Sequence, residues 1–265
     1  MSFASLMACT SSSQGDGSGN VQCTKATCSI NNRKAGQIEI GSLRFKKVKV
    51  ESEVFGAEGA KESAEQETDT AIQVNLQNNG DRDALINEVQ VEIKGRLNIT
   101  NCPGGAGGGY VTTRYAVAVS PEARVPATFV ANLRDGYDYS YIKAGKTDAL
   151  TVSVGLDRYF SGQYPVLFEL RIILVTGKGQ SVRSDYAVIV ASDGLAEIAE
   201  GQYRQWQDLG KPAGGKEPDS RNPVLECFAK QADKIDSFIR DQRIVSPTVL
   251  HMRDEFRKSR LFSVD

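Results

Sequence analysis

The sequence predicts a mainly β protein with antiparallel sheets and a C-terminal helical region, from three observations. The first is residues 89–100, where odd positions are apolar, apart from Gly95, and even positions are polar. Successive side chains of a strand point to opposite faces, so this period of two is typical of an antiparallel strand with one buried face. The second is that similar runs recur between residues 37 and 192. The third is a change to helical spacing after Ser192.

The alternating runs predict two stacked sheets, a β-sandwich. Besides residues 89–100, they occupy residues 72–76, 115–119, 129–133, 150–156, 164–174 and 182–190. About eight to ten strands with turn signals at regular intervals favour a sandwich or a barrel, and we choose the sandwich.

The segment that follows residue 37 departs from regular alternation. Within residues 37–54 the pattern slips by one position at Gly41-Ser42 and again at Lys46-Lys47. Slips of this kind predict either a strand pair or one strand with bulges. Residues 56–69 are acidic and rich in small side chains, so we expect a loop there.

In the last part of the chain, apolar residues at helical spacing predict about three α-helices. Their stripes run through residues 195–206, 225–239 and 249–256. The pairs Asn222-Pro223 and Ser246-Pro247 are typical helix starts, with a cap followed by proline. We expect the apolar stripes to pack on the sandwich; the alternative is a surface that binds another protein.

The chain therefore divides into a disordered tether with a small cysteine loop (1–36), the sandwich (37–192) and the helical region (193–265). Its 32 Lys and Arg against 33 Asp and Glu give a net charge of −1. No long-range field attracts polyanions, so we expect no nucleic-acid partner. No apolar stretch approaches the roughly 20 residues of a membrane span, so membrane contact is expected only through a lipid anchor.

The cysteines bear on the compartment of the protein. The tetrad Leu6-Met7-Ala8-Cys9 resembles the lipobox of bacterial lipoproteins, whose cysteine carries the lipid, and the Ser- and Gly-rich residues 10–20 resemble the tether that follows it. Only eight residues precede Cys9 and none is basic, whereas a secretion signal needs a basic and apolar leader. Either the chain is truncated, or Cys9 is a free thiol in a disordered N-terminus.

The other four cysteines allow two disulfides. Cys23 and Cys28 flank four residues, so a disulfide would close a tight loop, and Cys102 and Cys227 would then pair, joining a sheet loop to the helices. Four cysteines allow three connectivities, and free thiols are the alternative. A zinc site at Cys23 and Cys28 is disfavoured, because structural zinc needs four ligands and the one histidine, His251, has no close partner.

No constellation of residues predicts catalysis, and we expect neither an enzyme nor a cofactor. Nucleophilic catalysis usually needs a histidine base, and His251 is expected on a helix surface. Tyr and Asp side chains near loop ends suit a sugar or calcium, because aromatic rings stack and carboxylates supply oxygen ligands; a tyrosine-rich strand edge is the plainer alternative. The predicted ligand contacts are Tyr137, Asp138, Tyr139, Tyr141 and Tyr159.

The turn residues add a resemblance. The segments LQNNGDRDALINEVQVEIKG, IKAGKTDALTVSVGLD and YPVLFELRIILVTGKGQSVRSDYAVIVAS resemble, in this order, the immunoglobulin-like accessory sandwiches of bacterial secreted and cell-surface proteins. In that family a strand ends in Asn-Asn-Gly-Asp, and a Gly-Lys-Thr-Asp turn opens a strand that closes the sheet. The resemblance covers residues 37–192 and implies a fold and a non-catalytic role, but no particular ligand.

Together these observations predict an exported, non-catalytic binding or structural module at the bacterial cell surface, with Cys9 as its lipid anchor. Its partner is expected to be a protein or a component of the cell envelope. One alternative is a cytoplasmic protein-interaction scaffold with free thiols. Another is a hydrolase that uses carboxylates on the loops.

Overall fold

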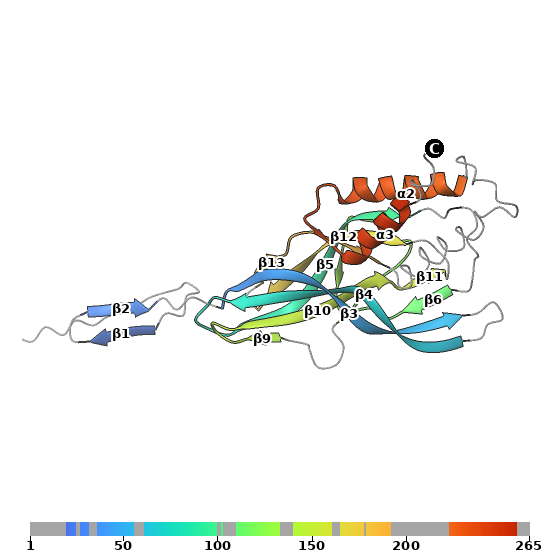
Figure 1. Cartoon of the computed structure of the whole chain (residues 1–265). Coiled ribbons are helices and arrows are strands. Elements are labelled where there is room, and N and C mark those ends of the chain that lie inside the picture. Colours follow the sequence, from blue (N-terminus) through green and yellow to red (C-terminus); the bar gives the residue numbers. More distant parts are fainter. Residues whose placement is uncertain are drawn as a thin grey trace, which may run out of the picture.

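The computed structural model describes residues 20–24, 27–31, 36–55, 61–99, 102, 110–132, 140–160, 165–177, 179–191 and 223–258 (Figure 1). Within these ranges the protein is mainly β, as predicted, with two mixed sheets, a two-stranded hairpin and two helices. The hairpin consists of β1 (Asn20–Thr24) and β2 (Thr27–Asn31), in which Cys23 lies opposite Cys28.

The first sheet has six strands in the order β11-β6-β3-β4-β10-β7. They are β3 (Ile38–Phe55), β4 (Lys61–Asn78), β6 (Tyr110–Thr113), β7 (Val117–Val119), β10 (Thr147–Leu156) and β11 (Arg158–Phe160). Neighbouring strands are antiparallel except for β7 and β10, which are parallel.

The second sheet has the order β15-β14-β12-β5-β8, with β13 also paired to β12 and β9 to β5. Its strands are β5 (Ala84–Asn98), β8 (Ala127–Val130), β9 (Ser140–Ile142), β12 (Val166–Thr176), β13 (Ser181–Arg183), β14 (Ala187–Val190) and β15 (Ile244–Val245). The pair β14 and β15 is parallel, and the other pairs are antiparallel.

The prediction of wholly antiparallel sheets is therefore wrong at one pair in each sheet. Parallel neighbours need a long crossover between them. Between β7 and β10 the chain leaves the first sheet to form β8 and β9 of the second. Between β14 and β15 it passes through a helix.

Residues from both sheets form one hydrophobic core, which we call the inter-sheet core. Ile72 of β4 and Val152 of β10 lie in it with Val91 of β5 and Phe168 of β12, and all four are fully buried. The alternation of β5 and β12 thus supplies one wall of this core. Burial of apolar area here is the main stabilising contribution.

The alternating apolar residues of β5 pack into two different cores. The register between β5 and β12 shifts at Glu169/Leu170, which leaves Lys94 as an extra, bulged residue. Before this bulge the odd residues of 89–93 lie in the inter-sheet core, whereas Leu97 and Ile99 pack on the opposite face of the sheet. A bulge shifts the side-chain phase by one residue, so an unbroken sequence pattern changes faces.

The second core, the helix–sheet core, lies between the second sheet and the helices α2 (Pro223–Ile239) and α3 (Pro247–Lys258), which cover this face in Figure 1. Leu167 and Val188 of the sheet are fully buried there. From the helices, Phe228 and Phe256 stack with their ring centroids 5.5 Å apart. The protein is thus layered as sheet, sheet and helices.

The described helices begin at the two prolines that the sequence marks as helix starts. Only two helices lie in the described part of the chain, so the prediction of about three is not met there. The predicted helix over residues 195–206 falls outside the described residues.

The bulges of β3 agree with the sequence prediction, whereas the start of β4 does not. Register shifts fall between Ile40 and Ser42 and between Lys46 and Val48, at the two predicted slips, within one bulged strand. The prediction of a loop over residues 56–69 is wrong from Lys61 onward, because β4 starts there opposite Phe55. Pairing with the long β3 outweighs the weak strand propensity of this acidic segment.

Candidate binding pocket at the end of the helical layer

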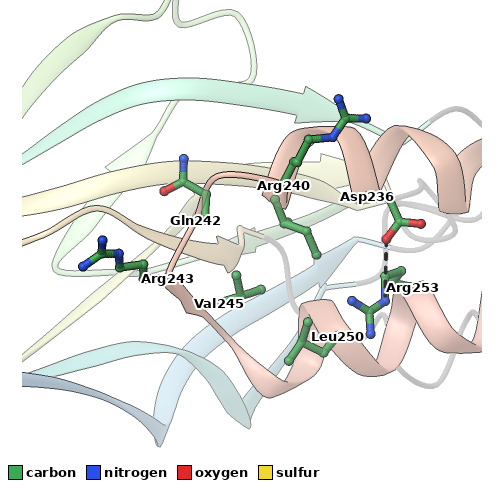
Figure 2. Close-up of a pocket in the computed structure, with 8 residues that line it drawn as sticks. Asp236, Arg240, Gln242, Arg243, Val245, Leu250 and Arg253 are labelled. Atoms are coloured by element: carbon green, nitrogen blue, oxygen red, sulfur yellow. Dashed lines mark ion pairs between the residues drawn. The ribbon is translucent and has the colours of Figure 1, made fainter.

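A pocket of about 440 Å³ lies where α2 ends, the chain turns and α3 begins. We call it the helix-turn pocket. Figure 2 shows Val245 and Leu250 between Arg243 on one side and Arg253 on the other, with Arg240 and Asp236 above them. Its lining residues are Asp236, Ile239, Arg240, Gln242, Arg243, Val245, Leu250 and Arg253.

The turn that forms one wall of the pocket is fixed to the sheet by a buried carboxylate. Gln242 Nε2 donates to Glu169 Oε1 over 2.8 Å, and Lys94 Nζ donates to the same oxygen over 2.7 Å. Glu169 is only 7% exposed. A buried carboxylate is costly unless it is paired, so these contacts hold the turn in place.

Gly95 makes room for this carboxylate, and its place in the alternating run of β5 is thereby explained. A Cβ atom at Gly95 would lie 3.0 Å from Glu169 Oε2, closer than side chains normally approach. Glycine therefore lets β5 pass beneath Glu169.

The other wall of the pocket is built on β15 and the start of α3. Ile244 and Val245 pair with Ala187 and Val188 of β14. The next backbone N–H, of Ser246, donates to the Val188 carbonyl over 2.9 Å. Ser246 Oγ accepts from the Val249 N–H over 3.3 Å, which caps α3.

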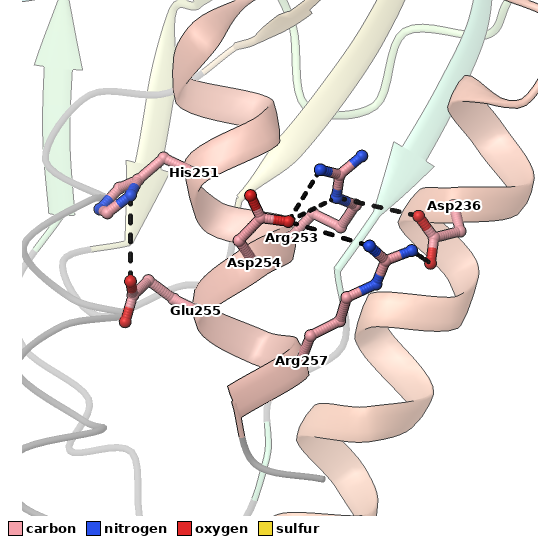
Figure 3. Close-up of polar contacts among 6 residues, drawn as sticks. All are labelled: Asp236, His251, Arg253, Asp254, Glu255 and Arg257. Carbon is pink, nitrogen blue, oxygen red and sulfur yellow. Dashed lines mark hydrogen bonds and ion pairs between the residues drawn. The ribbon is translucent and has the colours of Figure 1, made fainter. Parts of the chain in front are cut away.

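Charged side chains link α2 and α3 beside the pocket (Figure 3). Arg253 contacts Asp254 at 2.7 Å and Asp236 of α2 at 3.9 Å, and Arg257 also pairs with Asp236. His251 is half exposed on α3 and lies 3.9 Å from Glu255, a surface position that agrees with the expectation for this residue. The carboxylate of Asp236 is thus shared by two arginines.

Two further arginines of the pocket keep exposed guanidinium groups. Arg240 and Arg243 are both exposed, and within the described residues neither makes an ion pair. Figure 2 shows them on the turn, apart from the Arg253 and Asp236 pair. The pocket therefore carries a local positive charge, although the whole chain has a net charge of −1.

A second polar cluster lies on the same face of the second sheet as Glu169. Tyr186 Oη donates to Glu92 Oε1 over 2.6 Å, and Arg171 donates to Glu92 Oε2 over 2.8 Å. These hydrogen bonds, that of Tyr186 first, lower the pKa of Glu92 below its ordinary value of 4.5. Lys94 and Arg171 lie over the Tyr186 ring, 4.9 and 4.8 Å from its centroid, so this cluster adjoins the Glu169 contacts.

A disulfide joins Cys102 to Cys227, whose Cα atoms are 5.7 Å apart. Cys102 follows β5, and Cys227 lies in the first turns of α2. The bond links positions 125 residues apart in the sequence, beside the helix–sheet core. It therefore fastens the helical layer to the sheet.

The predicted ligand contacts are not brought together within the described residues. Tyr141 is 65% exposed on β9, which belongs to the second sheet, whereas Tyr159 lies in β11 of the first. Tyr137, Asp138 and Tyr139 fall outside the described residues, as does Cys9.

Asp157 is an unusual carboxylate near the end of β10. Its Oδ1 is buried and has no hydrogen-bond partner in the described part of the structure. Burial raises the pKa of Asp157, with the nearby Glu122 carboxylate acting in the same direction and Arg158 against it. This group is therefore less stable in its ionised form than an exposed aspartate.

Three or more His, Cys, Asp or Glu side chains do not gather as a metal site in the ranges that the structure describes. Neither described helix is long and apolar enough to span a membrane.

The helix-turn pocket was not anticipated from the sequence. Arg240 and Arg243 follow the apolar stripe of α2, where basic residues are ordinary because they suit a helix C-terminus. Only the return of the chain through β15 places them around the same pocket as Arg253.

Comparison with known proteins gives no match: no family model fits the chain, and neither the curated proteins nor the solved structures include a significant relative.

Proposed function

We propose that this protein is an exported, non-catalytic binding module of the bacterial cell surface, with an immunoglobulin-like sandwich as its scaffold. A lipid at Cys9 would tether it to the membrane. Its partner is a protein or a component of the cell envelope.

The observation that carries this proposal is the Cys102–Cys227 disulfide. Disulfides persist in oxidising compartments such as the periplasm and the cell surface and are rare in the cytosol. The bond supports export over the alternative of a cytoplasmic scaffold with free thiols.

The helix-turn pocket supports binding as the role of the exported module. It combines an apolar centre with exposed guanidinium groups on a turn that is anchored to the sheet. Sites with a few fixed polar groups around apolar side chains are typical of recognition. The third possibility, a hydrolase with loop carboxylates, gains less support: Glu122 is close enough to Asp157 to raise its pKa, but neither residue lines the helix-turn pocket.

Thiol alkylation of the protein purified from its native host, under denaturing and non-reducing conditions, tests the proposal. We expect Cys102 and Cys227 to remain unmodified until a reductant is added, and mass spectrometry of their peptides identifies them. Four or more alkylated cysteines before reduction would refute export.

A further inference from the structure

We propose that the helix-turn pocket binds an acidic peptide segment of a protein partner, in which carboxylates flank an apolar side chain. This inference rests on the proposed function, since it names the chemistry that the binding module recognises.

The charges of the pocket favour an anionic ligand. Three arginines line it against one carboxylate, that of Asp236, and Asp236 is already paired with Arg253 and Arg257. Arg240 and Arg243 are exposed and make no ion pair within the described residues. The planar guanidinium group matches a carboxylate with two parallel hydrogen bonds, so these two side chains suit acidic residues.

The apolar residues favour a peptide over other anions. Val245 and Leu250 line the pocket, are only partly buried and lie between Arg243 and Arg253 (Figure 2). An apolar ligand side chain would remove them from water, while carboxylates on either side reach the arginines. The volume of about 440 Å³ suits a few side chains. A membrane presents a broad surface of headgroups, which fits a pocket of this size less well.

The construction of the pocket favours binding with little rearrangement. Gln242 is held by the buried Glu169, and Val245 belongs to a strand that pairs with β14. A fixed turn loses little conformational entropy on binding, which raises affinity.

Fluorescence anisotropy with the full chain and a labelled synthetic peptide of alternating glutamate and leucine tests the inference. We expect saturable binding that weakens as salt is added, because the arginines are exposed. The double variant Arg240→Ala/Arg243→Ala should bind at least about tenfold more weakly, as expected when hydrogen bonds to charged groups are lost. Both side chains are exposed, so the variant is expected to fold.

The matched control is Arg124→Ala. Arg124 is also exposed, but it precedes β8, at the opposite edge of the second sheet from β15. This variant should bind the peptide as the wild type does. A peptide with lysine in place of glutamate should not bind.

Three results would overturn the inference: no binding to the wild type, equal binding to the double variant, or binding of the lysine peptide. Binding of phosphatidylglycerol vesicles in place of the peptide, lost in the double variant, would overturn it in favour of a membrane surface. If the peptide does not bind but Cys102 and Cys227 resist alkylation in protein from the native host, the inference fails and the proposal of export stands. If the peptide binds but these two cysteines are alkylated before reduction, the proposal of export fails and the inference stands.

Discussion

The inter-sheet core and the helix–sheet core are held together in different ways. Among the described residues, the first contains 23 buried side chains and none from a helix, while the second contains 12 and includes Cys102. The smaller core is supplemented by a disulfide, by stacked phenylalanines and by the buried Glu169. We therefore expect apolar burial to be sufficient for the two sheets, and the helical layer to depend on its specific links.

The largest effect is expected from a cavity in the inter-sheet core. Phe168→Ala removes a fully buried ring and should lower the free energy of unfolding by about 3–5 kcal/mol. Denaturant titration followed by circular dichroism measures it. Val130→Ala, at a residue that is 60% exposed, is the control and should change little. A loss below about 1 kcal/mol for Phe168→Ala would show that this core is not tightly packed.

Removal of the disulfide tests the link of the other core. The double variant Cys102→Ser/Cys227→Ser opens a loop of 125 residues and should cost about 2–5 kcal/mol, chiefly by freeing the unfolded chain. Thermal unfolding of the oxidised wild type and the variant gives the difference. The reduced wild type, which keeps Cys102 and Cys227 but lacks their bond, serves as the control for the two serine side chains. Equal stability of variant and wild type would mean that the helical layer needs no crosslink.

The strands were the part of this fold that the sequence could predict. Period-two alternation reports which residues share a face, and the slips at Gly41-Ser42 and Lys46-Lys47 marked real bulges. The bulge at Lys94 left no such mark, because apolar residues continue at odd positions on both sides of it. The odd-numbered residues of β5 therefore form one continuous pattern in the sequence, although those before the bulge lie in the inter-sheet core and those after it lie in the helix–sheet core.

The candidate site depended on tertiary structure and could not be predicted. Glu169 falls on a polar position of the alternating pattern of β12, so the sequence does not mark it as unusual. It is buried because Lys94 and Gln242, which are distant in sequence, donate hydrogen bonds to it. The parallel pairing of β15 is likewise set by the return of the chain from α2. Local patterns carry no signal for either contact.

A smaller effect is expected at the cap of α3, where the helix–sheet core meets the pocket. Ser246→Ala removes the hydroxyl that accepts from the Val249 N–H and should cost about 1 kcal/mol. Denaturant titration gives the value, and Ser246→Asp, which keeps a capping acceptor, should recover part of it. If alanine and aspartate destabilise equally, the buried position of Ser246, and not its cap, determines the cost.

The smallest effect is expected at Glu92, which belongs to the polar cluster on the second sheet and lies outside both cores. The pKa of Glu92 is lowered in the folded state, so its stabilising contribution is complete above the ordinary value of 4.5 and is lost as pH falls through the folded-state value. Wild type should exceed Glu92→Gln in thermal midpoint at neutral pH, and the gap should close in acid. A gap that does not change with pH would exclude the ionised carboxylate as its source.

Hydrogen exchange, read by mass spectrometry on the oxidised and the reduced protein, tests most directly whether the two cores are held differently. We expect reduction to speed exchange in α2 and α3 while the amides of β5, β10 and β12 stay protected. Equal loss of protection in helices and sheets, or no change in the helices, would contradict the account.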